Sequence, residues 1–200
     1  IGKTKNLTCI SRPRRFGKSY AAQMLCAYYD KTCDSQELFS EYKIYKEPSF
    51  EKHLNKYNVI QIDMNSEYQS IEDKDSLIKS ITDSIKEEML VAFPMITIDD
   101  NDSLARSIQK IHYGTGETFI VIIDEYDVLV REKVNRELFD RYLSFLNGLF
   151  KSATVRPAVA LAYLTGILPI VRDRIQSKLN NFDEYTILDA AELSEYVGFT

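Results

Sequence analysis

Apolar residues along the chain follow two patterns that alternate from one end to the other. Short apolar runs bounded by polar or turn residues are typical of strands buried in a parallel sheet. These runs predict strands at residues 7–11, 59–64, 119–123, 158–164 and 185–188. Between them, apolar residues recur at the three- and four-residue spacing of amphipathic helices. This spacing predicts helices at residues 20–29, 50–56, 76–92, 104–112, 135–152 and 171–178, and the polar segment 31–49 predicts a loop with short helical pieces.

The alternation of strands and helices indicates the fold class. It predicts βαβ crossovers, and therefore an α/β protein with a mainly parallel sheet. In such sheets, ligands bind at the carboxyl ends of the strands. Ser11, Asp124 and Thr165 each stand at the end of a predicted strand. We therefore expect these three residues to lie on the same rim of the sheet.

The loop after the first strand has the character of a phosphate-binding loop. It contains Gly17, Lys18 and Ser19 between a strand-like run and a helix-like run. In such a loop, backbone N–H groups cradle the phosphates, the lysine reaches the outer phosphates and the hydroxyl ligates Mg²⁺. The pattern G-x-x-x-x-G-K-[ST] also has an earlier glycine, where this chain has Arg12. A Gly-Lys-Ser run by itself also occurs by chance.

A second stretch supports a nucleotide site. The apolar run 119–123 ends in Asp124 and Glu125. In P-loop ATPases, an acid that closes such a strand holds Mg²⁺, and the following Glu can orient and deprotonate the attacking water. The alternative is that the two acids are only the polar end of a core strand. Together with the loop at 11–19, they favour a nucleotide site.

These motifs resemble those of the bacterial AAA-ATPase-like family, whose loop characteristically reads Arg-Pro-Arg-Arg-Phe-Gly-Lys-[Ser/Thr]. The matching segments are 11–19, 122–127, 164–168, 179–182 and 196–200. The resemblance implies a P-loop NTPase three-layer sandwich, with five strands in the order 5-1-4-3-2. In that family Arg is usual at the position of Arg12. Members often carry a C-terminal nuclease-like domain of the PD-(D/E)XK type, and this chain stops before any such domain.

The motifs and the resemblance together predict a site for ATP and Mg²⁺. The residues expected to contact the nucleotide are Arg14, Arg15, Phe16, Gly17, Lys18, Ser19 and Tyr20. Ser19 and Asp124 are the expected metal residues, the latter through water. Glu125 is the expected general base, and Lys18 acts on the phosphates. Thr165 stands where related ATPases keep a polar residue between the γ-phosphate and water, although a buried Thr could also simply bond to backbone.

Several charged residues have open roles. Candidates for an arginine finger, in cis or from a neighbouring subunit, are Arg131, Arg136, Arg141, Arg172 and Arg174. We favour Arg172 and Arg174 because they follow the strand that ends at Thr165, although any of the five could be a surface residue. Asp127 could support the metal or cap the following helix, and we favour the cap. The acidic turn 99–103 suits an N-cap better than a Ca²⁺ site.

Composition limits the class of protein. The chain has 200 residues, of which 44% are hydrophobic and 28% charged, which suits a single domain over residues 1–200. Because it begins at Ile1, we expect it to be a piece of a longer protein. The formal net charge of −5 argues against a dedicated nucleic-acid binder. A homo-oligomer stays open.

The sequence gives little support for a metal site built on cysteine or histidine, or for a membrane location. The three cysteines, Cys9, Cys26 and Cys33, show no metal-binding spacing and suit free thiols in a reducing cytoplasm. The two histidines, His53 and His112, are isolated. No apolar run approaches 18 residues, so we expect no membrane span and a cytoplasmic protein.

Three functions follow from this reading. The first is Mg²⁺-dependent ATP binding and hydrolysis. The second is a nucleotide-gated signalling or assembly switch with little turnover. The third is an ATPase that regulates an attached nuclease-like domain on nucleic acid. A GTPase is disfavoured because the chain has no Asn-Lys-x-Asp stretch, and the Asp-Glu pair favours water over a small acceptor such as that of a kinase.

Overall fold

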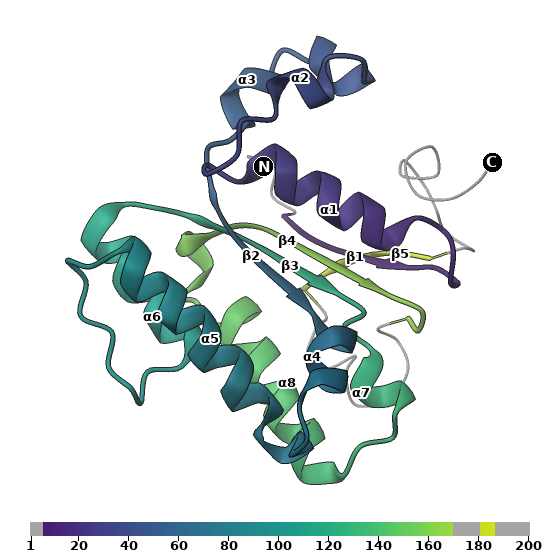
Figure 1. The fold of residues 1–200 in the computed structure, drawn as a ribbon, viewed down its shortest axis with the longest axis vertical. Coiled ribbons are helices and arrows are strands. Elements are labelled where there is room, and N and C mark those ends of the chain that lie inside the picture. Colours follow the sequence, from purple (N-terminus) through teal and green to yellow (C-terminus); the bar gives the residue numbers. More distant parts are fainter. Residues whose placement is uncertain (1–5, 170–180, 187–200) are drawn as a thin grey trace.

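Five parallel strands form the centre of the protein in a computed structural model, which describes residues 6–169 and 181–186 (Figure 1). The strands are β1 (Leu7–Ser11), β2 (Asn58–Asp63), β3 (Phe119–Asp124), β4 (Val159–Gly166) and β5 (Asp183–Tyr185). They lie in the order β2-β3-β4-β1-β5, and every pairing is parallel. The predicted fold class and the predicted strand order are therefore confirmed.

Helices cover both faces of the sheet and make it the middle of three layers. Helix α1 (Lys18–Tyr29) lies on one face, while α5 (Leu77–Ala92), α6 (Leu104–Thr115) and α8 (Arg136–Phe150) cover the other (Figure 1). All six residues of β3 are buried. Its side chains alternate, so that Ile120 and Ile122 pack toward α1 whereas Val121 and Ile123 pack into the larger core. This burial explains the continuous apolar run in the sequence.

Local side chains set the ends of the longer helices. The Asn135 side chain accepts a hydrogen bond from the Leu138 N–H at 2.8 Å, and the Ser103 hydroxyl accepts one from the Arg106 N–H at 3.2 Å. The expected N-cap in the acidic turn 99–103 is thus confirmed. The helix break expected within residues 113–116 comes at the last of these residues, because α6 continues to Thr115. It ends where Gly116 adopts a left-handed φ of 75°.

Several smaller predictions need correction. Asp63 ends β2 and caps an unexpected helix, α4 (Met64–Ser70), so Met64 is helical. The helix expected at 50–56 is only the turn α3 (Phe50–His53). The last strand lies at 183–185 rather than 185–188. The helix expected at 171–178 falls outside the described residues.

A small lobe interrupts the path from α1 to β2. It contains α2 (Gln36–Phe39), the 3-10 turn η1 (Lys43–Lys46) and α3, and we call residues 36–53 the lobe. The lobe lies on the side of α1 that faces away from the sheet (Figure 1). Its own small core joins Phe39 and Phe50 to Tyr28 of α1. The expectation of short helical pieces in the segment 31–49 is confirmed.

The remaining described elements are short. They are the 3-10 turns η2 (Lys74–Ser76) and η3 (Arg156–Ala158) and the helix α7 (Val128–Arg131). Helix α7 follows β3 directly and leads to α8. Within the described ranges, no helix has both the length and the apolar character needed to cross a membrane.

Candidate functional site

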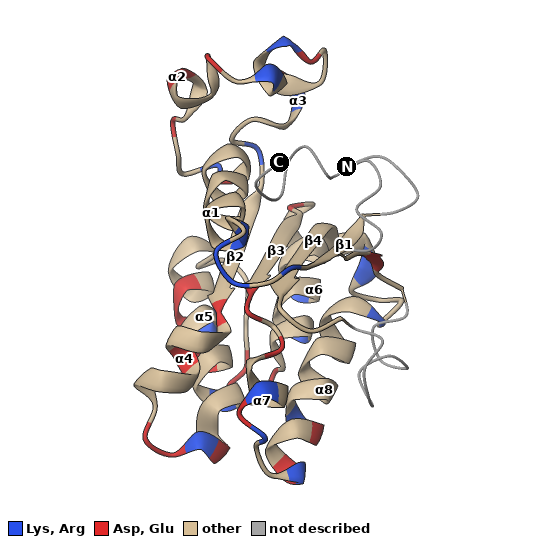
Figure 2. Cartoon of the chain, turned by 90° about the vertical axis from the view of Figure 1, so that its right-hand side faces the viewer, with Lys and Arg blue, Asp and Glu red and all other residues tan. Residues whose placement is uncertain are grey.

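The expected residues converge at the carboxyl edge of the sheet. Ser11 at the end of β1 pairs with Gly166 at the end of β4, and β4 pairs with β3, which ends at Asp124. Figure 2 shows the basic loop before α1 crossing the ends of the strands beside the acidic segment that follows β3. The parallel pairing brings these three segments together although they are far apart in the sequence.

The loop between β1 and α1 has the backbone of a phosphate cradle. Gly17 adopts a left-handed φ of 73° immediately before α1, and Arg15 has a φ of 68°. A Cβ at Gly17 would meet nothing within 4 Å, so backbone conformation rather than space favours glycine there. Arg14, Arg15, Ser19 and Tyr20 are exposed, whereas Lys18 is buried.

Lys18 lies at the centre of a cluster of charges. Its Nζ donates to the Pro13 carbonyl at 2.9 Å, which closes the loop on itself. Burial lowers the pKa of Lys18, and nearby Asp124, Glu125 and Asp127 oppose this effect. Burial outweighs the three carboxylates. The Lys18 ammonium is therefore a poorly hydrated cation. An anionic group would bind it more strongly than the Pro13 carbonyl does.

Asp124 and Thr165 contact each other directly. The Thr165 hydroxyl donates to Asp124 Oδ1, and the Glu125 N–H also donates to this oxygen, at 3.0 Å. Thr165 is fully buried, and Asp124 is nearly so. The Thr165 hydroxyl therefore donates to the acid at the end of β3, and it also accepts a hydrogen bond from the Glu125 N–H at 3.4 Å. Oδ1 of Asp124 therefore accepts two hydrogen bonds, and these fix the orientation of the carboxylate.

Glu125 has a strained backbone and a cationic partner. Its φ is 53°, in the left-handed region that non-glycine residues seldom adopt. Its carboxylate is bonded to the guanidinium of Arg131, whose Nε lies 3.4 Å from Asp127 Oδ2. Such outliers persist where the surrounding structure holds them, often at functional sites.

Arg131 is the candidate arginine that lies at the site. Arg141 pairs with Asp75 and Glu137, and Arg136 pairs with Asp140; both arginines line a groove between α5, α6 and α8 that no loop residue lines. Arg172 and Arg174, which we favoured, lie outside the described residues. The spacing of four between Asp127 and Arg131 was the sequence signal for their ion pair.

Asp127 occupies the N-cap position of α7, but its carboxylate makes no capping hydrogen bond, so the prediction that this carboxylate caps the helix is wrong. Its Oδ2 accepts hydrogen bonds from the Ile167 N–H at 3.1 Å and the Leu168 N–H at 2.9 Å. The carboxylate is drawn to the segment after β4 because two successive amides there are open to it. Tyr126 strengthens the same junction, since its hydroxyl donates to the Leu168 carbonyl at 2.6 Å.

The donor set suits Mg²⁺ held mainly by phosphates and water. Ser19 supplies a hydroxyl and Asp124 a carboxylate, which are hard oxygen ligands. Among the described residues, no group of three or more His, Cys, Asp or Glu side chains is arranged to hold a metal. A metal at this edge would therefore need ligands from a bound polyphosphate.

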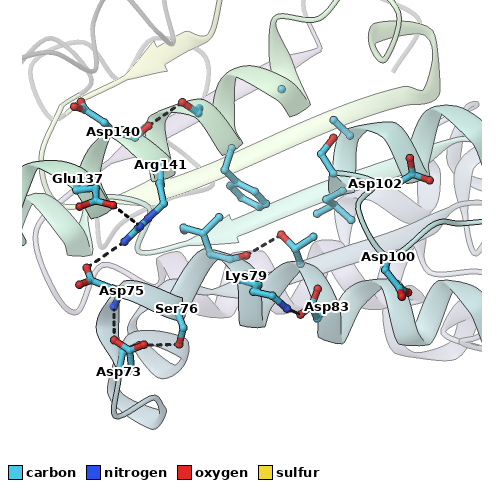
Figure 3. A pocket seen from close by; sticks show the side chains of 18 of the residues that line it. Asp73, Asp75, Ser76, Lys79, Asp83, Asp100, Asp102, Glu137, Asp140 and Arg141 are labelled. Atoms are coloured by element: carbon cyan, nitrogen blue, oxygen red, sulfur yellow. Dashed lines mark hydrogen bonds and ion pairs between the residues drawn. The ribbon is translucent and has the colours of Figure 1, made fainter.

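A large groove lies elsewhere in the described part of the chain. It measures about 1200 Å³ and runs between α5, α6 and α8. Figure 3 shows that its acidic side chains are largely occupied by neighbours, with Arg141 bonded to Asp75 and Glu137, and Lys79 bonded to Asp83. None of the loop residues lines it. Its size alone does not make it the functional site, because a phosphate loop needs no deep cavity.

Comparison with known proteins agrees with this geometry. Residues 1–176 match the model of a family described as "Predicted AAA-ATPase". A protein of Azotobacter chroococcum mcd 1, named "Uncharacterized protein in vnfD 5'region", is 24% identical over 200 residues. The alignment covers 96% of this chain and 36% of that protein, so the chain spans about a third of the length of this relative.

Proposed function

The chain belongs to the AAA-ATPase-like family, and on that premise we propose that it binds ATP with Mg²⁺ and hydrolyses it. The observation that carries this proposal is the convergence of Lys18, Asp124 and Glu125 at one edge of the sheet. Nucleotide binding follows from the family. Hydrolysis and the role of Mg²⁺ are our inference from the side chains.

Phosphate binding rests on the loop and on Lys18. Backbone N–H groups at the start of α1 point outward and carry partial positive charge. Lys18 leaves the Pro13 carbonyl and donates to the outer phosphates. Ser19 and Asp124 hold the metal, whose charge offsets that of the phosphates. Thr165 keeps the Asp124 carboxylate oriented toward that position.

Hydrolysis rests on Glu125. Its carboxylate accepts a proton from the water that attacks the γ-phosphorus, and the bond to the β-phosphate oxygen breaks to leave ADP and phosphate. For this, Glu125 must turn from Arg131 toward the water. Arg131 stays within reach of the same phosphates, where it can offset the charge that develops. Catalysis is then positioning and charge neutralisation.

The test compares the wild type with Lys18→Ala and Glu125→Gln in Mg-ATP binding and turnover. We expect Lys18→Ala to lose binding, and Glu125→Gln to keep binding while turnover falls by a factor of about 100 or more, as for removal of a general base. Normal hydrolysis by Glu125→Gln would remove Glu125 from the role of base. Normal binding by Lys18→Ala would remove the loop from phosphate binding.

One observation favours the switch as a second candidate. The ion pair with Arg131 occupies the carboxylate of Glu125, which is the proposed base. This suits a protein that hydrolyses ATP slowly until a signal breaks the ion pair. For a switch, particle mass measured by light scattering rises on addition of ATP, and Arg131→Ala raises turnover several-fold. For a constitutive ATPase, mass is unchanged by ATP and turnover does not rise.

A further inference from the structure

Arg12 is a buried cation at the start of the phosphate loop. It directly follows β1, and only 7% of its surface is exposed. Its Nε is buried and has no hydrogen-bond partner. Within residues 6–169 and 181–186, no carboxylate forms an ion pair with this guanidinium. An arginine stays charged in a protein, so a buried guanidinium without an anion destabilises the fold that contains it.

The side chain of Arg12 leaves β1 on the face that α1 covers. The Arg12 N–H donates to the Gly166 carbonyl at 3.0 Å, so the parallel ladder continues through this residue. Successive side chains of a strand point to opposite faces of the sheet. Cys9 packs into the large core, whereas Ile10 belongs to the small core that includes Ala22 of α1. Arg12 therefore shares the face of Ile10.

Along that face, Arg12 is level with the first turn of α1. The helix runs back antiparallel to β1 (Figure 1). Two residues of a strand advance about 6.6 Å, and four residues of a helix advance about 6 Å. Because Ile10 shares a core with Ala22, Arg12 is level with Lys18. The Lys18 ammonium also donates to the carbonyl of Pro13, the residue after Arg12, at 2.9 Å.

The first turn of α1 has no anion of its own. Gly17 at the N-cap provides no side-chain cap, and no acidic residue lies in the first turn. The backbone N–H groups of such a turn carry partial positive charge and attract anions. A phosphate group has enough oxygens to accept from these N–H groups and from a guanidinium at the same time, and guanidinium and phosphate pair in a bidentate way. One bound phosphate therefore satisfies both features.

We propose that Arg12 binds a phosphate group of the nucleotide at the N-terminus of α1, together with Lys18. This proposal rests on the proposed function, because it uses the same loop. A glycine at this position lets the phosphate approach the backbone, whereas Arg12 supplies the contact from a side chain. Arg14 and Arg15 are exposed, so water already solvates their charges. Arg12 is the arginine of this loop whose charge depends on the ligand.

The experiment measures phosphate affinity and ligand-free stability in the same variant, Arg12→Met. Calorimetry gives its affinity for Mg-ATP and for Mg-tripolyphosphate, which has the phosphates alone. We expect both affinities to fall by the same factor, about ten- to a hundredfold, as for loss of a hydrogen bond between charged groups. Without ligand, Arg12→Met melts at or above the wild-type temperature, because the substitution removes an unpaired buried charge. Arg12→Lys keeps the charge but not the planar fork, so its affinities fall less.

A matched control is Arg106→Met. Arg106 is exposed and lies on α6, on the opposite face of the sheet, so its loss leaves both affinities unchanged.

Three results overturn the role of Arg12 alone. The first is unchanged phosphate binding by Arg12→Met while Lys18→Ala abolishes it. The second is a loss of affinity for ATP but not for tripolyphosphate, which would place Arg12 at the nucleoside. The third is an Arg12→Met protein that fails to fold or melts well below the wild type without ligand, which would make Arg12 a structural residue. A wild type that binds neither ATP nor tripolyphosphate overturns the phosphate site, and the role of Arg12 with it.

Discussion

The guanidinium of Arg131 is bonded to the carboxylate of Glu125, the residue that follows the last buried position of β3. The same guanidinium lies beside Asp127, which in turn accepts two amide hydrogen bonds from the segment after β4. A single arginine thus connects the proposed base to the ends of two strands. The segment after β4 is therefore linked to Glu125 through the side chains of Asp127 and Arg131.

Loss of Arg131 should reduce stability. Arg131→Ala leaves the carboxylate of Asp127, which is only 1% exposed, without its cation. We expect the free energy of unfolding to fall by about 2 kcal/mol, less than for a fully buried pair because Glu125 is partly open to solvent. Urea unfolding measures this change. The control is Arg141→Ala, whose surface ion pairs should contribute under about 1 kcal/mol; equal losses in both variants would contradict the prediction.

The Thr165 hydroxyl should matter for turnover more than for binding. Thr165→Val keeps the shape of the side chain but removes the donor to Asp124. We expect a loss of about 2 kcal/mol in stability, as for a hydrogen bond to a charged group. Turnover should fall about tenfold or more while the affinity for ATP changes little. Thr165→Ser keeps the hydroxyl and serves as the control, and an equally impaired Ser variant would show that only packing matters.

Gly166 has no room for a side chain. A Cβ there would lie 2.6 Å from the Tyr126 ring and 2.9 Å from Asp127 Oδ1. Gly166→Ala should therefore lower the free energy of unfolding by about 1–3 kcal/mol, the usual effect of overpacking. Gly148→Ala is the matched control. Its Cβ would meet only Ala105 at 3.5 Å within a helix, so this variant should be as stable as the wild type or slightly more stable.

The lowered pKa of Lys18 has a consequence for stability. Between that lowered pKa and the ordinary value of 10.5, the unfolded chain binds more protons than the folded protein. This difference makes stability rise with pH in that window, so the charged lysine costs stability at neutral pH. Lys18→Met should thus melt at or above the wild-type temperature at pH 7, with the difference vanishing above pH 10.5.

The effect of Mg-ATP on the stability of the wild type and of Lys18→Met tests the role of Lys18 in a second way. At 100 times its Kd, Mg-ATP should stabilise the wild type by about 2.7 kcal/mol and leave Lys18→Met unchanged. A variant that melts well below the wild type at pH 7 would show that Lys18 is a structural residue rather than a strained functional one.

Lys86 holds the acidic turn 99–103 in place. Its ammonium is buried and donates to the carbonyls of Asp99 at 2.8 Å, Asp100 at 2.7 Å and Asp102 at 3.1 Å. Lys86→Met should leave these carbonyls unsatisfied and lower the free energy of unfolding by about 2–3 kcal/mol. Lys79→Met removes an exposed lysine from the same helix and should change stability little. Added Ca²⁺ should not restore the Lys86 variant, because backbone carbonyls alone make a poor Ca²⁺ site.

Much of the architecture could be predicted from local pattern. The continuous apolar run of β3 and the periodic apolar face of α5 are clear signals, so the positions of both elements were predicted to within a residue or so. The ends of α3 and α6 were less well predicted, because Gly114 stays inside α6 whereas Gly116 ends it, and because a short helix has too few positions to show a period. The strand order came from the resemblance to a family and not from periodicity.

The sequence by itself determined the Gly-Lys-Ser loop, the acid pair after β3 and the parallel sheet that brings them to one edge, because each depends on residues adjacent in the chain or on a repeating pattern. Only the tertiary structure decided that the Asp127 carboxylate binds the amides after β4 and that Lys86 binds the carbonyls of the acidic turn. Those contacts join side chains to amides or carbonyls of other segments. A partner of that kind is set by how the chain folds back on itself, and no spacing along the sequence records it.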